Sequence, residues 1–147
     1  MTDFEFYNPV KIFFGKDQIS KIGAEIPSGS KILLLYGGGS IFRNGVYDKA
    51  KEALKGYDIT EFGGIEPNPS YETCMKAVET IKLKQIDFLL AAGGGSVIDA
   101  AKFIAAAALY TRGDPWDILS KEIPVTAALP IGVILTLPAP GTEMNKN

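Results

Sequence analysis

Two short apolar runs, each followed by the same four residues, restrict the fold of this chain more than any other feature. KILLLY (31–36) leads into Gly-Gly-Gly-Ser at 37–40, and IDFLLAA (86–92) leads into Gly-Gly-Gly-Ser at 93–96. A continuous apolar run closed by glycine is typical of a strand covered on both faces of a parallel sheet. The repeat therefore indicates two equivalent strand–loop–helix units, with each glycine loop at the carboxyl end of its strand.

The rest of the chain alternates between strand-like and helix-like segments in the same way. We expect strands at 31–36, 58–63, 86–92 and 130–138, and helices at 17–26, 46–55, 71–84 and 96–110. This alternation predicts an α/β fold: a doubly wound, mainly parallel, Rossmann-like sheet with right-handed crossovers. Apolar and aromatic residues flank Asn8-Pro9, a turn signal, so residues 3–14 are expected to form an N-terminal β-hairpin at one edge of the sheet.

The second glycine loop has the stronger case for binding a phosphate. Ser96 is a good N-cap residue and Asp99 follows three residues later, a variant of the capping box that predicts a helix beginning at Ser96. Gly93–Gly95 would let the backbone approach an anion closely, with amide groups and the helix dipole directed at it. A pyrophosphate is the natural ligand. The alternative is that the glycines only permit a tight turn or close packing of helix on strand.

The first glycine loop differs in its chemistry. Ser40 is followed three residues later by Arg43 instead of an acid, and Asn44-Gly45 then signals a turn, so we expect no long helix directly after this loop. In dinucleotide-binding folds an acid near such a strand end holds the ribose 2′-hydroxyl, whereas small or basic residues accommodate a 2′-phosphate. Gly37–Ser40 offer no acid, which favours NADP(H) over NAD(H). The alternative is that this loop contacts no ligand.

Composition excludes several classes of function. The chain contains no histidine and a single cysteine, Cys74, which excludes Ser-His-Asp and Cys-His catalysis, an internal disulfide and the usual zinc ligand sets. A formal net charge of −2 without a basic block argues against nucleic acid as a partner. The apolar runs are too short to cross a membrane and the first residues lack the pattern of a signal peptide, so a cytoplasmic location is expected.

Several longer segments carry a family resemblance in a fixed order. They are FYNPVKIFFGK, KILLLYGGGSIFRNGVYDK, EFGGIEPNPS, FLLAAGGGSVIDAAKFIAAA, GDPWDIL and ALPIGVILTLPAPGTEMN. With these segments the chain resembles the N-terminal half of the iron-containing alcohol dehydrogenase family, most closely its NAD(P)H-dependent butanol dehydrogenase type.

The resemblance implies that residues 1–147 form a dinucleotide-binding domain. In the family, a C-terminal helical domain carries the divalent metal, iron or zinc, and the substrate pocket, and we expect that domain to be absent here. The family's metal ligands, one aspartate and three histidines, lie downstream of the Glu-Met-Asn segment, which explains the missing histidines. This chain is therefore expected to supply no catalytic residue and no metal ligand, and to be inactive alone.

The resemblance also implies roles for individual residues. The second loop corresponds to the pyrophosphate loop, the first to the loop around the adenosine ribose, and the end of the last strand to the nicotinamide half. The cofactor-binding residues implied are Gly37, Gly38, Gly39, Ser40, Gly93, Gly94, Gly95, Ser96, Asp99, Thr136 and Leu137. Pro140 departs from the family pattern, because it has neither a hydroxyl nor an amide hydrogen where the nicotinamide side would be contacted.

The preferred interpretation is the cofactor-binding half of an NAD(P)H-dependent alcohol or aldehyde oxidoreductase, in which the complete enzyme transfers a hydride. The main alternative is a non-catalytic dimerising or nucleotide-binding remnant of that family. A further alternative is a relative of glycerol dehydrogenase or dehydroquinate synthase, against which the butanol-type segments argue. In the family the aromatic N-terminal segment contributes to dimer contacts, so a homodimer is expected.

Overall fold

The computed structural model describes residue 5, residues 7–138 and residues 141–145. Its centre is one sheet of four strands: β1 (Lys31–Tyr36), β2 (Asp58–Phe62), β3 (Phe88–Gly93) and β4 (Ile131–Leu135). The strand order is β2-β1-β3-β4 and every pairing is parallel. This confirms the predicted Rossmann-like sheet.

The two strands that precede the glycine loops lie in the middle of the sheet. All six residues of β3 are buried, as are the four central residues of β1. The two strands pair in parallel from Ile32 opposite Phe88 to Tyr36 opposite Ala92. Because helices cover both faces, these strands consist of continuous apolar runs without the alternation of a half-exposed strand.

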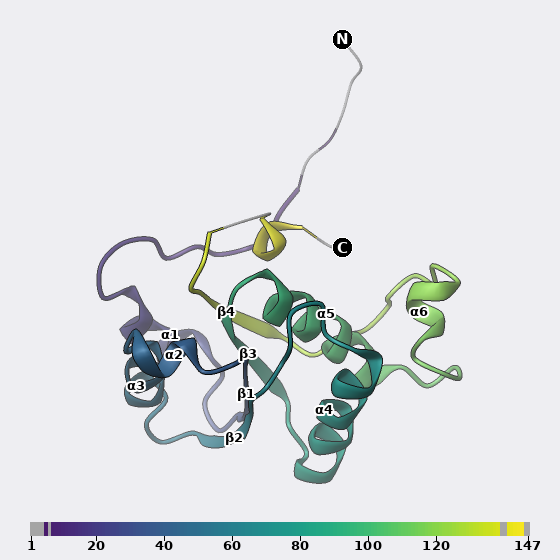
Figure 1. Cartoon of the computed structure of the whole chain (residues 1–147), viewed down its shortest axis with the longest axis horizontal. Helices are drawn as coiled ribbons and strands as arrows, with labels where there is room; N and C mark the ends of the chain where they lie inside the picture. Colours follow the sequence, from purple (N-terminus) through teal and green to yellow (C-terminus); the bar gives the residue numbers. More distant parts are fainter. Residues whose placement is uncertain (1–4, 6, 139–140, 146–147) are drawn as a thin grey trace.

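Helices flank the sheet on both sides, as the doubly wound prediction requires. The helical segments are η1 (Gln18–Lys21), α1 (Ile22–Glu25), α2 (Ser40–Arg43), α3 (Val46–Ala53), α4 (Tyr71–Lys84), α5 (Gly95–Leu109), α6 (Asp117–Ser120) and η2 (Thr142–Met144). Figure 1 shows α4 and α5 on one side of the sheet and α1–α3 on the other. The apolar core accordingly forms two clusters, one beneath α4 and α5 and one beneath α1 and α3.

The predicted N-terminal hairpin is wrong for the residues that the structure describes. Residues 5 and 7–14 form no strand, while residues 3, 4 and 6 of the segment lie outside the description. Asn8 Oδ1 accepts a hydrogen bond from the Val10 amide at 2.9 Å, a local turn that replaces a ladder bond. The side chain of Phe14 is 96% exposed, so a hairpin here has no apolar surface to cover it.

Candidate functional site

The loops that follow the four strands meet at one edge of the sheet. Past the end of β1, the Ile65 amide donates to Tyr36 O at 3.1 Å and the Gly64 amide donates to Gly37 O at 3.3 Å. Past the end of β3, the Thr136 amide donates to Gly93 O at 3.0 Å. The carboxyl edge of an open parallel sheet is where such folds bind ligands.

Val97 shows how close the two glycine loops are. Its buried side chain lies in the first turn of α5. A Cβ placed on Gly93 would lie 2.6 Å from Val97 Cγ2, and a Cβ on Gly37 would lie 3.6 Å from the same atom. One methyl group of Val97 thus lies close to both loops. Close helix–strand packing therefore explains the glycine at position 93.

The helix after the second loop begins earlier than the sequence indicates. Gly94 is the N-cap of α5, and the amides of Val97 and Ile98 donate to Gly94 O at 3.1 and 3.3 Å. The prediction that Ser96 caps this helix is wrong, since glycine at 95 already adopts helical geometry. Ser96 Oγ instead accepts a hydrogen bond from the Asn68 amide at 3.4 Å.

This arrangement leaves backbone donors at the start of a long helix. Val97 and Ile98 are bonded to Gly94 O, so the amides of Gly95 and Ser96 are the first donors of α5 that have no intrahelical acceptor. The first turn of α5 contains no acidic residue. Amide donors and the positive end of a helix dipole make such a terminus favourable for an anion.

The segment after β4 approaches the second loop. A Cβ on Gly94 would lie 3.8 Å from Leu137 Cβ, and the Leu137 side chain is 62% exposed. Together with the bond from Thr136 to Gly93, this contact places Thr136 and Leu137 beside the second loop. The structure thus brings these sequence-predicted residues together, while Pro140 lies outside the described residues.

The first loop is open on its outer side. Gly39 has φ +98°, a conformation that favours glycine, and leads directly into the four residues of α2. Gly45 is then the N-cap of a separate helix, α3, which confirms the prediction that no long helix follows this loop directly. Gly38 has no positive φ, and a Cβ there would meet no atom within 4 Å. Among the three glycines of the first loop, Gly38 is therefore the position where a side chain could be added most easily.

Asp99 lies apart from the capping position predicted for it. Its side chain is exposed on α5 and lines a groove of about 400 Å³ next to α4. The groove is walled mainly by apolar and aromatic side chains, including Phe103 and Trp116, and Cys74 also lines it. Burial raises the pKa of the Cys74 thiol to about 11, which keeps it protonated at neutral pH.

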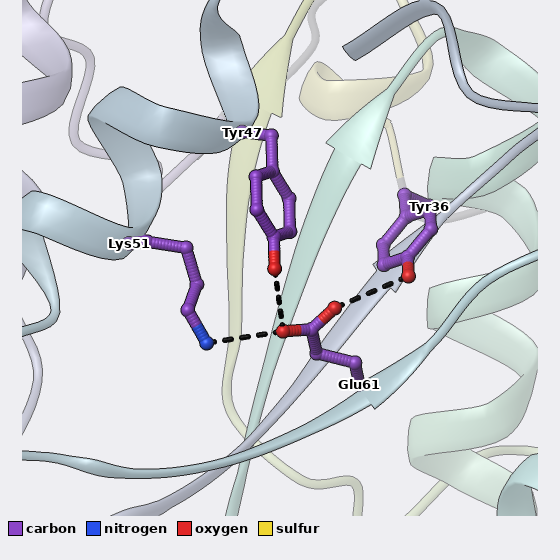
Figure 2. Close-up of polar contacts among 4 residues, drawn as sticks. All are labelled: Tyr36, Tyr47, Lys51 and Glu61. Atoms are coloured by element: carbon purple, nitrogen blue, oxygen red, sulfur yellow. Dashed lines mark hydrogen bonds and ion pairs between the residues drawn. The ribbon is translucent and has the colours of Figure 1, made fainter. Parts of the chain in front are cut away.

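One acidic residue near the first loop was not singled out from the sequence. Glu61, near the end of β2, accepts hydrogen bonds from the hydroxyls of Tyr47 at 2.8 Å and Tyr36 at 3.2 Å, and it forms an ion pair with Lys51 at 3.0 Å (Figure 2). Burial raises the pKa of this carboxyl, but the bonds from Lys51 and the two tyrosines outweigh that effect and lower it. The only sequence signal was an acid at a strand end before two glycines.

Glu66 fixes the loop between β2 and α4. Its Oε1 accepts from the Ser70 amide and from Thr73 Oγ1, both at 2.9 Å, while Ser70 caps α4 by accepting from the Thr73 amide. The backbone bond from Ser70 is the main reason why the pKa of Glu66 falls to about 2. This loop reaches Ser96 through Asn68, so the carboxylate supports the second glycine loop from the side.

The low pKa of Glu66 predicts a specific dependence of stability on pH. Its folded-state pKa is depressed, so its contribution is present above the pKa of the unfolded chain and is lost as pH falls through the folded-state value, between roughly pH 4.5 and 2. We expect Glu66→Gln to flatten the decline of unfolding free energy across this window, measured by urea denaturation. Glu72→Gln, which removes an acid from the first turn of the same helix, is the control. Equal slopes for wild type and Glu66→Gln would contradict the assignment.

The described residues do not offer a metal-binding site. Across residues 5, 7–138 and 141–145, no group of three or more histidine, cysteine, aspartate or glutamate side chains could hold a metal ion. The sequence contains no histidine at all. Within the same ranges, no helix is long and apolar enough to span a bilayer.

Comparison with known proteins identifies the family to which this chain belongs. The model of the iron-containing alcohol dehydrogenase family matches residues 9–147. The chain belongs to this family. The NADPH-dependent aldehyde reductase YqhD of Escherichia coli is 51% identical over 149 residues, covering 99% of this chain and 38% of the relative. NADH-dependent butanol dehydrogenase A of Clostridium acetobutylicum is 47% identical over 149 residues, covering 99% of this chain and 38% of the relative.

Solved structures agree with the sequence comparison. The substrate- and cofactor-free form of the E. coli aldehyde reductase matches with a TM-score of 0.90 and 49% identity, over 93% of this chain and 37% of that one. The NADH-dependent butanol dehydrogenase A of Thermotoga maritima matches with a TM-score of 0.93 and 48% identity, over 99% of this chain and 37% of that one. The chain thus spans less than two fifths of the length of these relatives.

Proposed function

We propose that this chain is the dinucleotide-binding part of an NAD(P)H-dependent alcohol or aldehyde oxidoreductase of the butanol dehydrogenase type. The observation that carries the proposal is the pair of glycine loops lying side by side at the carboxyl edge of the sheet, one of them opening into α5. Relatives that share about half of its residues are named as NADPH- or NADH-dependent enzymes.

Each part of the edge receives a role in this proposal. The pyrophosphate would bind at Gly93–Ser96, where the first amides of α5 are available. The adenosine ribose would lie at Gly37–Ser40. The nicotinamide half would lie toward Thr136 and Leu137, which lie beside Gly93 and Gly94 just past the last strand. Asp99, which the sequence associates with the pyrophosphate, lies on the exposed face of α5, so it would accompany the cofactor from that face.

We propose that the preferred cofactor is NADP(H). Gly37–Ser40 contain no acid, and the nearby carboxylate of Glu61 already accepts hydrogen bonds from Tyr36, Tyr47 and Lys51. Arg43 is exposed on α2, directly after the loop, where a 2′-phosphate would be attracted. The relatives alone do not decide this preference, because their names include both cofactors.

Calorimetric titration with NADPH and NADH tests this proposal. Saturable binding of either cofactor supports a competent binding edge, and tighter binding of NADPH supports the 2′-phosphate preference. Tighter binding of NADH would overturn the preference. A folded chain that binds neither would overturn the proposal and favour the non-catalytic remnant.

The chemical step is proposed for the complete enzyme only. There, a divalent metal of the kind that gives the family its name would polarise the substrate oxygen, while the dinucleotide exchanges a hydride with the substrate carbon. Since the described residues hold no metal-ligand cluster, this chain would bind and orient the cofactor without turning over substrate.

We also propose a homodimer formed through the N-terminal segment. The side chains of Tyr7, Ile12 and Phe14 are 83%, 61% and 96% exposed on an extended stretch that pairs with no strand of the described sheet. Exposed apolar groups in this number favour association. We expect sedimentation equilibrium to give twice the monomer mass at micromolar concentration, and Ile12→Asp with Phe14→Asp to give a folded monomer whose melting temperature no longer depends on protein concentration. A wild-type monomer would contradict the proposal.

A further inference from the structure

The side chains around Glu61 form a hydrogen-bonded cluster beside the first glycine loop. Glu61 lies on β2, Tyr36 is the last residue of β1, and Tyr47 and Lys51 lie on α3 (Figure 2). The first glycine loop and α2 occupy the stretch of chain between Tyr36 and Tyr47. One carboxylate is therefore bonded to residues on both sides of the loop.

The contacts of this carboxylate are divided between its two oxygens. Tyr36 donates to Oε2 at 3.2 Å, whereas Tyr47 at 2.8 Å and Lys51 at 3.0 Å both donate to Oε1. The Glu61 side chain is 30% exposed and the Lys51 side chain 38% exposed, so this pair is partly shielded from solvent. The strand end and the helix are thereby held at a fixed separation.

Aromatic side chains also pack together beside the first glycine loop. Phe42, in α2, contacts the ring of Tyr36 edge-on with centroids 5.5 Å apart, and the ring of Tyr47 with centroids 4.6 Å apart. A Cβ on Gly39 would lie 3.5 Å from the Phe42 ring. The loop is therefore packed against a helix that both tyrosines hold in place.

The glycine that follows β2 serves this arrangement. A Cβ on Gly63 would lie 2.3 Å from Cε2 of Tyr36, so the tyrosine ring lies across the backbone at that point. Only glycine leaves room for the ring in the orientation that reaches Glu61. The Glu-Phe-Gly segment thus supplies both the acceptor for Tyr36 and the space for it.

We propose that Glu61 is a positioning residue that, through Tyr36 and Tyr47, preorganises Gly37–Ser40 to receive the adenosine ribose and its 2′-phosphate. The inference rests on the proposed dinucleotide function and deepens it by assigning a residue outside the loop to cofactor affinity. A loop already held in its bound shape loses less conformational freedom on binding, and that difference appears as affinity. Glu61 itself contacts no ligand in this proposal.

The test separates the first loop from the second with ligand fragments. Adenosine 2′-monophosphate probes the first loop and inorganic pyrophosphate probes the second, both titrated against the intact chain by NMR. For the double variant Tyr36→Phe with Tyr47→Phe, which keeps both rings and removes both hydroxyls, we expect the Kd of the nucleotide to rise about tenfold. We expect the Kd of pyrophosphate to stay within about twofold, since the second loop is unchanged.

Two further variants keep the test informative. Tyr57→Phe removes a hydroxyl that donates to Gly23 O and Ile26 O at 2.8 Å, away from the loop, so it should lower the melting temperature without changing the nucleotide Kd. Glu61→Gln, which removes the charge that Lys51 and the tyrosines share, should weaken nucleotide binding in the same direction as the double variant.

The possible outcomes are distinct. If the wild type binds adenosine 2′-monophosphate and both the double variant and Glu61→Gln bind it equally well or more tightly, the positioning role is overturned while the proposed function stands. If the variants weaken both fragments equally, the effect is general destabilisation and the positioning role is also overturned. If the wild type binds neither fragment nor NADPH, the proposed function fails and this inference fails with it.

Discussion

Replacing Gly38 with aspartate is expected to reverse the cofactor preference of the chain. No atom lies within 4 Å of a Cβ at this position, so the side chain fits without disturbing the fold. The new carboxylate would lie where the 2′-phosphate of NADPH is proposed to bind, and like charges placed together cost several kcal/mol. We expect the Kd for NADPH to rise about 100-fold, equivalent to about 2.7 kcal/mol, while the Kd for NADH changes little or falls because the ribose 2′-hydroxyl gains an acceptor.

Gly38→Asn is the matched control for this change. Asparagine has nearly the same shape and no charge, so it should leave the ratio of the two dissociation constants within about threefold of wild type. Calorimetric titration of the three proteins with both cofactors gives the comparison. An aspartate variant that keeps its preference for NADPH would show that the first loop does not receive the 2′-phosphate.

Replacing Gly93 with alanine is expected to damage both stability and cofactor binding. The added Cβ would lie 2.6 Å from Cγ2 and 2.9 Å from Cβ of Val97, which is buried. Overpacking of this kind costs about 1–3 kcal/mol, and relieving it would displace the start of α5 from the sheet. We expect a melting temperature lower by several degrees and NADPH binding weakened at least about tenfold, because the anion-binding amides move with the helix.

A second substitution can relieve part of this strain, which makes the prediction specific. Val97→Ala removes the two methyl groups that the new Cβ would meet, so the double variant should be more stable than the sum of the two single changes predicts. Gly38→Ala, in open space, should leave the melting temperature within about one degree of wild type. Full additivity in urea denaturation would show that the two residues do not contact each other.

The central elements of the fold could be predicted because their signals are local. The strand at 31–36 and the helix at 71–84 have the bounds that the sequence indicates. The strand is one uninterrupted apolar run, and the helix begins at an N-cap serine and ends at Gln85 in a left-handed conformation. In both cases each end of the element is marked by residues next to it in the sequence.

The hairpin and the cap of α5 were not predictable from the same kind of signal. The alternation of aromatic residues before and after Asn8 resembles a strand pair, but forming one requires a surface to cover it, and no local pattern reports whether that surface exists. At the second loop, a good capping serine lies two positions after the residue that caps the helix. Val97 also packs closely on Gly93, a contact that the capping signal does not report.

Part of the candidate site could also be predicted from local signals, and part depends on tertiary contacts. The sequence places glycine loops after two strands, and parallel pairing of those strands then brings both loops to one edge. The role of Glu61 could not be seen in this way, because its three partners come from β1 and α3 and lie 10 to 25 residues away in the chain. Only the folded structure shows that this acid is already occupied.

The measurement that tests the central claim most directly is an NMR titration of the isotope-labelled chain with NADPH. If the two glycine loops and the end of β4 form one dinucleotide site, the amide signals of residues 37–40, 93–96 and 136–137 should shift together with a single Kd. Shifts confined to the groove between α4 and α5, or no shifts at saturating NADPH in a folded sample, would contradict the account.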